Sequence, residues 1–172
     1  MEETIRKAIE GDQNAFTLIF LQLQKKLYRI AYNRLKNEFD ACDAIQETMI
    51  IVYNNLNKIN KPESYESWIT SILINECKKI YNKKNKVIAL NLDDYNDILI
   101  HDNEKSEDEI IFYDMLKGLT EKEQIILILY FQNKYTSKKI GEILDIKDNT
   151  IKSIIKRAKS KLKKDFKEVV NE

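Results

Sequence analysis

The segment that decides the fold reads TSKKIGEIL over residues 136–144 and DNTIKSIIKRAK over residues 148–159. Apolar residues recur at every third or fourth position in both pieces, which predicts two amphipathic helices. The three residues between them, Asp145-Ile146-Lys147, leave room only for a tight corner. Two short helices joined in this way form a helix-turn-helix, whose second helix enters the major groove of DNA. The segment therefore predicts DNA binding.

The second predicted helix is basic on the side opposite its apolar stripe. The stripe consists of Ile151, Ile154 or Ile155, Ala158 and Leu162. The opposite face carries Lys152, Ser153, Lys156, Arg157 and Lys159. DNA grooves are lined by negatively charged phosphates, so a helix face that contacts DNA is expected to be basic.

The composition predicts an all-α protein with a packed core. The chain has 172 residues, 43% of them hydrophobic, with only three Gly and one Pro. So few helix breakers among residues of high helix propensity favour helices throughout. No apolar run is long enough to span a membrane, and residues 1–6 do not resemble a signal peptide, so we expect a cytoplasmic protein.

The net charge of +1 hides a strong asymmetry along the chain. Residues 147–167 contain nine basic and two acidic residues, and residues 75–86 contain five Lys and one Glu. Between these blocks, residues 91–114 contain nine acidic residues and one Lys. The distribution of charge is therefore compatible with nucleic-acid binding at two places, although the net charge of the whole chain does not indicate it.

The patterns divide the chain into two small helical domains and a linker. Residues 1–86 predict four helices, with Asp12 or Asn14 capping the second and the third beginning near Asp40. Residues 87–108 lose periodicity and are acidic, which predicts a linker. Residues 109–172 predict helices over 109–119 and 121–131, the second capped by Thr120, followed by the helix-turn-helix.

Neither cysteine nor the single histidine predicts a reactive site. Cys42 and Cys77 have no second pair and no neighbouring His, and each falls in a helical pattern, where a buried structural role is expected. His101 lies in the acidic segment without a partner. Trp68 is expected to anchor the core. No phosphate loop, nucleophile–base set or metal-ligand cluster is present, so we expect neither an enzyme nor a cofactor.

Three motifs together resemble a known family. DACDAIQET at residues 40–48 is similar to the family segment Asp-Ala-x-Asp-Leu-x-Gln-Glu-Thr, with Ala44 in place of Leu. YESWI at 65–69 is similar to Phe-x-x-Trp-Leu, and Asn75 follows at the expected distance. NTIKS at 149–153, followed by KRA at 156–158, resembles the family's recognition helix. The family is the sigma factors of bacterial RNA polymerase, in the two-domain extracytoplasmic-function type.

The resemblance implies a division of labour between the domains. The N-terminal domain would bind core RNA polymerase and open the downstream (−10) promoter element, and the C-terminal domain would read the upstream (−35) element. The acidic linker would follow polymerase channels that are built for a polyanion. The family also implies a free monomer and a partner anti-sigma factor, which is commonly anchored in the membrane.

The resemblance assigns a polymerase-binding face to the third helix. Its polar residues recur near helical spacing, and on the residues alone a solvated face would be the plainer explanation. The expected polymerase-binding residues are Asp40, Asp43, Gln46, Glu47 and Asn54.

The fourth helix carries the expected contacts to the downstream element, since lysines neutralise phosphates and aromatic rings stack on unpaired bases. These residues are Lys78, Lys79, Tyr81, Lys83 and Lys84. The preceding loop, residues 58–64, would form part of a pocket for a flipped base. Lys79 and Asn82 replace an Asp and an Arg that the family often has, which leaves the base preference open.

The expected contacts to the upstream element lie on both helices of the helix-turn-helix. Basic side chains contact guanine or phosphate, and small polar side chains contact base edges or the backbone. These residues are Thr136, Ser137, Asn149, Lys152, Ser153, Lys156 and Arg157. Ile154 stands where the family often has Arg, so more of the affinity would rest on Lys156 and Arg157. Gly141 occupies the position where such units need a small residue.

Two other functions remain open at this stage. A transcription regulator could use the same helix-turn-helix as a dimer on symmetric half-sites, with the N-terminal helices as a ligand-binding or dimerisation module. Alternatively, a decoy could occupy core polymerase through its first domain and open no promoter.

Overall fold

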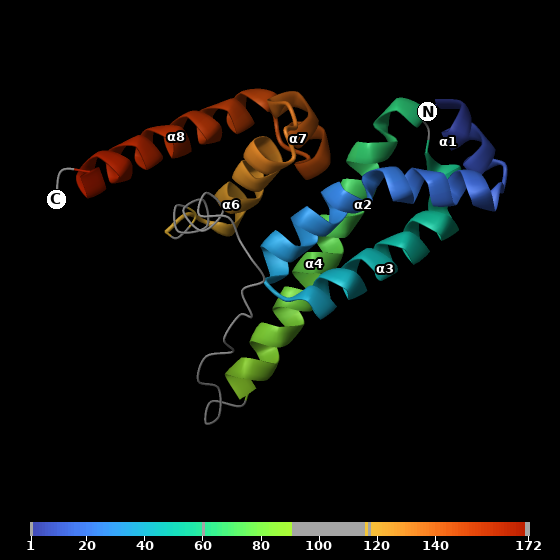
Figure 1. Ribbon diagram of the computed structural model, residues 1–172, viewed down its shortest axis with the longest axis horizontal. Coiled ribbons are helices and arrows are strands. Elements are labelled where there is room, and N and C mark those ends of the chain that lie inside the picture. The colour runs from blue at the N-terminus through green and yellow to red at the C-terminus, as the bar shows by residue number, and fades with distance from the viewer. Residues whose placement is uncertain (1, 60, 91–115, 117, 171–172) are drawn as a thin grey trace. The chain divides into compact units, whose positions relative to one another are not determined.

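The computed structural model describes residues 2–59, 61–90, 116 and 118–170, and only the backbone of 85–90 and 161–170. Every regular element in these ranges is helical (Figure 1), which confirms the predicted all-α class. The chain divides into two compact units, residues 1–99 and 100–172. Most of the predicted linker and most of the predicted helix over 109–119 lie outside the described residues.

The first unit begins with three helices, and side-chain caps set the starts of the second and third. Helix α1 spans Glu2–Ile9, α2 spans Gln13–Leu35 and α3 spans Glu38–Asn55. The Asp12 carboxylate accepts hydrogen bonds from the backbone N–H groups of Asn14 (2.8 Å) and Ala15 (3.1 Å). Asn37 caps α3 in the same way, so this helix begins two residues before the predicted start. Capping of this kind satisfies N–H groups that have no partner inside the helix.

The first unit closes on the long helix α4. Two single-turn 3₁₀ helices, η1 (Leu56–Lys58) and η2 (Pro62–Ser64), lead into α4, which spans Tyr65–Leu90. It continues four residues past the predicted domain boundary at residue 86. Helices α2, α3 and α4 pack against one another around apolar side chains that are almost fully buried, such as Leu27, Val52 and Leu73.

The second unit contains a π-helical turn that the apolar pattern did not predict. Thr120 and Glu123 form a capping box at the start of α6, which spans Glu121–Leu127. The following element η3, Ile128–Gln132, is a π-helix, and the Asn133 N–H donates to the Ile128 carbonyl at 3.2 Å. The helix predicted over 121–131 is therefore present, but its second half is a π-helix and not an α-helix.

The helix-turn-helix is formed by α7, Ser137–Leu144, and α8, Asp148–Val170. At the corner, Asp145 adopts the left-handed conformation (φ 53°) and the Ile146 N–H donates to the Gly141 carbonyl at 2.9 Å. A Cβ atom on Gly141 would lie 2.6 Å from the Ile146 carbonyl oxygen. A side chain is excluded at this position because the backbone of the corner already fills the space.

Burial corrects one of the two predictions for cysteine. Cys77 is buried as expected, whereas Cys42 is exposed on α3, because Ala41 and Ala44 take the inward positions of that turn. Trp68, expected in the core, is only partly buried. Within the described ranges no helix is long and apolar enough to cross a membrane.

Candidate functional site

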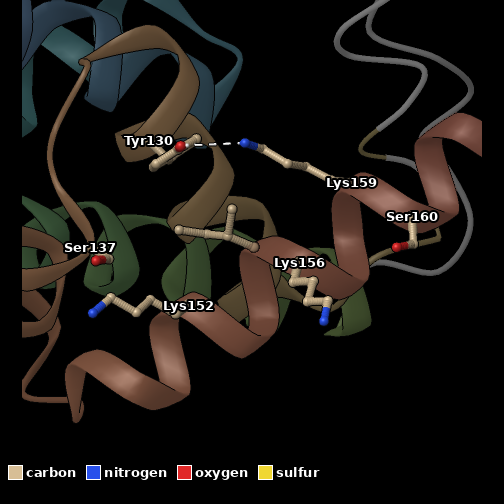
Figure 2. Close-up of a pocket in the computed structure, with 7 residues that line it drawn as sticks. Tyr130, Ser137, Lys152, Lys156, Lys159 and Ser160 are labelled. Atoms are coloured by element: carbon tan, nitrogen blue, oxygen red, sulfur yellow. Dashed lines mark hydrogen bonds between the residues drawn. The ribbon is translucent and has the colours of Figure 1, made fainter.

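A groove on the second unit brings together side chains from three elements (Figure 2). It has a volume of about 530 Å³ and lies between the recognition helix α8, the start of α7 and the π-turn η3. Its lining residues are Tyr130, Ser137, Lys152, Ile155, Lys156, Lys159 and Ser160. The polar side chains in this lining are hydroxyls and ammonium groups, so the groove offers hydrogen-bond donors and positive charge to an anion.

Asp148 fixes one end of this groove. Its carboxylate lies 2.6 Å from the Lys152 ammonium. Hydrogen bonds from Lys152 and then Ser137 lower the pKa of the Asp148 carboxyl. Asp148 also stands in the first turn of α8, where a negative charge is favourable to the helix dipole. Lys152, a predicted DNA contact, is therefore held by an acidic neighbour.

The remaining upstream residues lie outside the groove. Thr136 is the N-cap of α7, its hydroxyl oxygen accepting from the Lys139 N–H at 3.2 Å. The Ser153 hydroxyl donates to the Asn149 carbonyl at 2.9 Å. Asn149 and Arg157 are exposed on α8, whereas Ile154 is buried in the domain core. The five predicted residues on α8 are thus all exposed, and two of them, Lys152 and Lys156, line the groove.

Tyr130 and Ser160 were not predicted at this site, and Lys159 was placed only on the polar face of the helix. Lys159 was visible in the sequence, because it continues the stripe of Lys152 and Lys156 at helical spacing. Tyr130 gave no such signal, since the π-turn that orients it has no counterpart in an α-helical pattern.

The basic residues of α4 do not share one face. Lys78, Lys79, Lys83 and Lys84 are all exposed, and they project on different sides of the helix. A second groove, of about 570 Å³, collects only two of them. It is lined by Ile51, Ile72, Asn75, Glu76, Lys78, Lys79 and Asn82. It therefore combines an apolar floor with amide, carboxylate and ammonium groups, a combination that suits an unpaired nucleotide.

Three of the five predicted downstream residues already have intramolecular partners. The Lys79 ammonium lies 2.7 Å from the Glu76 carboxylate, which is largely buried. Lys84 pairs with Asp40 at the start of α3. The Arg34 guanidinium stacks on the Tyr81 ring, 4.9 Å from its centroid. Asp40 and Lys84, expected to serve different partners, are thus in direct contact.

The predicted polymerase-binding face of α3 is exposed, and it contains apolar residues that the prediction did not include. Asp43, Gln46, Glu47 and Asn54 point to solvent. Phe39 (81% exposed), Ile50 (55%) and Tyr53 (50%) project from the same helix. An exposed mixture of large apolar and acidic side chains is typical of a surface that another protein covers.

No cluster of three or more His, Cys, Asp or Glu side chains that could hold a metal ion occurs among the residues that the structure describes. The candidate sites are two charged grooves and one mixed helix face, which offer charged, polar and apolar side chains for binding.

Comparison with known proteins gives two family matches in the order of the two units. Residues 19–87 match Sigma-70 region 2, and residues 115–164 match Sigma-70, region 4. The chain is 27% identical to the ECF RNA polymerase sigma factor SigW of Bacillus subtilis, over 98% of this chain and 100% of that one. It is 26% identical to the RNA polymerase sigma factor SigV of the same organism, over 78% of this chain and 81% of the relative.

Solved structures agree with this fold. The structure of CnrH in complex with the cytosolic domain of CnrY superposes with a TM-score of 0.73 at 17% identity, covering 96% of both chains. The sigma factor RpoE of Bartonella quintana, solved with the anti-sigma factor NepR, superposes with a TM-score of 0.72 at 21% identity, covering 88% of this chain and 96% of RpoE. With both family regions present in order and relatives matched over nearly their full length, the chain belongs to the sigma-70 family of RNA polymerase sigma factors, in the extracytoplasmic-function type.

Proposed function

We propose that this chain binds core RNA polymerase and directs promoter-specific initiation of transcription, recognising an upstream and a downstream promoter element and aiding DNA melting. The observation that carries the proposal is the presence of region 2 and region 4 on one chain, at residues 19–87 and 115–164. A protein with region 4 alone could bind DNA, but it would lack the unit that is proposed to bind polymerase. The pair of regions favours a polymerase subunit.

Each partner has a candidate surface of suitable chemistry. The exposed face of α3 with Asp43, Gln46 and Glu47 is the candidate surface for core polymerase. The groove on α4 with Asn75, Lys78, Lys79 and Asn82 is the candidate site for the melted downstream strand. The exposed side of α8 with Lys152, Lys156 and Arg157 is the candidate surface for the upstream duplex. The domain limits 1–86, 87–108 and 109–172 remain our proposal for the division of these tasks.

We further propose that the protein is cytoplasmic and that it is a monomer when it has no partner. We also propose that an anti-sigma factor binds it and keeps it inactive. Support comes from the solved structures with the same fold, one of which is a complex of the sigma factor RpoE with the anti-sigma factor NepR. Co-purification of the tagged chain from its own cells, followed by identification of a stoichiometric partner, tests this directly. A partner that dissociates when core polymerase is added would support competition for one surface.

The experiment that tests the function is transcription in vitro from native promoter DNA by purified bacterial core polymerase, with and without this protein. We expect defined start sites that appear only when the protein is added. Core polymerase that binds the protein but opens no promoter would identify a decoy instead.

Paired variants test the division of labour. Lys156→Ala with Arg157→Ala should weaken promoter binding by about thirtyfold or more, because each good base contact contributes about 1–3 kcal/mol and the variant loses two of them. Binding to core should be unchanged. A matched control is Lys122→Ala with Lys134→Ala, which removes two exposed charges of the same unit outside α8. Equal loss of promoter and core binding would refute separate surfaces.

The reciprocal variant is Asp43→Ala with Glu47→Ala, which should weaken core binding and leave the second unit folded. Its control is Glu2→Ala with Glu10→Ala, two exposed acidic residues at the ends of α1. Core affinity that stays at the wild-type value would show that α3 does not carry the polymerase contact.

The competing function is a dimeric helix-turn-helix regulator. Sedimentation of the free chain and a binding assay on palindromic DNA distinguish the two, since a regulator is expected to be a dimer on symmetric half-sites. Tight binding to a palindrome by the protein alone, with no effect on initiation, would favour the regulator.

A further inference from the structure

Lys159 and Tyr130 form a contact that the predicted DNA-binding set does not include. The Lys159 ammonium donates a hydrogen bond to the Tyr130 hydroxyl at 3.3 Å (Figure 2). The same ammonium lies 4.7 Å from the centroid of the Tyr130 ring and 5.4 Å from that of Phe131. The two rings meet edge to face, with centroids 5.1 Å apart. The end of an exposed lysine is thus held by two aromatic rings and one hydroxyl.

The π-turn η3 creates this arrangement. Ile126, Leu127, Ile128 and Leu129 are all buried, so the α6–η3 segment is covered by protein on several sides. The next two residues, Tyr130 and Phe131, are partly exposed and reach Lys159 on α8. Single π-turns are rare and are frequently found at functional sites.

The contact does little for stability. Lys159 is exposed, and an exposed cation–π contact with one hydrogen bond to a neutral group contributes about 1 kcal/mol or less. Among the side chains that the structure describes, no carboxylate forms an ion pair with Lys159. The contact orders the long Lys159 side chain before a ligand binds. Binding then costs less side-chain rotamer entropy than it would for a mobile lysine.

Both groups line the groove and have donors that their mutual hydrogen bond does not use. The Lys159 ammonium has three N–H donors and uses one of them on Tyr130, while the hydroxyl proton of Tyr130 remains available. Two donors 3.3 Å apart suit one anionic oxygen, and the neighbouring Lys156 and Lys152 add positive charge along the same groove. The ligand chemistry that fits is a phosphodiester.

We propose that Tyr130 and Lys159 form a phosphate clamp for the backbone of duplex DNA, with Lys159 as the contact and Tyr130 as the residue that positions it. The clamp rests on the proposed function, in which α8 faces the upstream promoter element. Lys159 lies seven residues after Lys152, which is about 10 Å along the helix axis. At that distance from the start of α8, which contacts the bases, we expect the clamp to contact a backbone phosphate. A phosphate contact adds affinity without sequence preference.

The test measures binding of the full-length protein to two short duplexes, a promoter mapped by the transcription assay and a scrambled sequence of the same composition, over a series of salt concentrations. Lys159→Gln should weaken binding to both duplexes by the same factor, roughly three- to tenfold. It should also reduce the slope of log affinity against log salt by about 0.9, the loss of one phosphate contact. Lys159→Arg should restore most of the slope.

Tyr130→Phe tests positioning separately, because it keeps the ring and removes only the hydroxyl. We expect a few-fold loss with an unchanged salt slope, and no further loss when Tyr130→Phe is added to Lys159→Gln. Lys122→Gln, an exposed lysine on α6, is the control for removing one charge elsewhere in the unit. Unchanged thermal unfolding of each variant verifies that its fold is intact.

The outcomes separate the clamp from the proposed function. If wild type prefers the promoter but Lys159→Gln and Lys122→Gln have the same small effect, the clamp is wrong and the function stands. If wild type shows no preference while Lys159→Gln alone loses affinity and slope, the clamp stands and specific recognition fails. Displacement of duplex from wild type by inorganic phosphate at matched ionic strength, but not from Lys159→Gln, would assign the site to free phosphate and overturn the clamp.

Discussion

Replacing Gly141 by Ala tests whether the corner of the helix-turn-helix depends on a close approach of two backbones. The new Cβ would lie 2.6 Å from the Ile146 carbonyl oxygen, and 3.7 Å from the backbone nitrogen of Asp148. Ordinary van der Waals contact begins at 3.4 Å, so the carbonyl must move by 0.8 Å (3.4 minus 2.6). Neither neighbour is a side chain that could rotate away, and the movement reaches the first residue of α8.

Two opposing contributions set the size of the effect. Inserting a methyl group into a filled space costs about 1–3 kcal/mol. Alanine within a helix is about 1 kcal/mol more favourable than glycine, which offsets part of this. We expect a net loss of about 1 kcal/mol, and at most about 2 kcal/mol, in the free energy of unfolding of the second unit. The unit should remain folded with a displaced recognition helix, so DNA binding should fall.

Hydrogen exchange measured by mass spectrometry resolves the two units in the full-length chain. Amides of α7 and α8 should exchange faster in Gly141→Ala, while the fluorescence of Trp68, the single Trp and part of the first unit, follows an unchanged urea transition. Lys138→Ala, an exposed position of α7, is the control for substitution by alanine without a clash. Unchanged or slower exchange in α7 and α8 of Gly141→Ala would refute the reasoning, because the corner would then relax at no cost.

Three further predictions concern single groups. Thr120→Ala removes the capping box of α6 and should destabilise the second unit by about 1 kcal/mol, measured by exchange of the α6 amides. Asp145→Ala should destabilise the same unit by about 1 kcal/mol relative to Asp145→Gly, since the residue has φ 53° and only Gly adopts this conformation freely; urea unfolding followed by circular dichroism measures the difference. Burial raises the pKa of Cys77 from 9.0 to about 12. The folded state then keeps a proton that the unfolded state releases, so this contribution to stability is complete below pH 9 and is lost as the pH rises towards 12. Urea titrations followed by Trp68 fluorescence should show this loss in wild type and not in Cys77→Ala.

The sequence was most informative where structure follows from neighbours along the chain. The periodicity of Ile140, Ile143 and Ile151 placed the helix-turn-helix. Thr120 was recognised as a cap, and Asp12 was one of two candidates, because capping joins residues only two or three positions apart. Such signals are local, so they could be seen without knowing the packing.

Features that depend on packing between helices were missed. The pair of Lys84 and Asp40 joins residues 44 positions apart, which no spacing rule connects. Cys42 is exposed because Ala41 and Ala44 of the same turn face inward. All three residues are small, so the sequence pattern does not show which of them is buried. The π-turn at 128–132 begins within a run of four consecutive buried residues, 126–129, and such a run fits several kinds of helix.

The contrast between the two cysteines makes the native protein suitable for site-specific labelling. Cys42 is exposed on α3, next to Asp43 on the proposed polymerase-binding face, whereas Cys77 is buried and remains a protonated thiol at working pH. A maleimide dye should therefore react at a single position without any engineered substitution. A fluorophore at that position lies on the surface that core polymerase is proposed to cover, so its emission can follow holoenzyme assembly in real time.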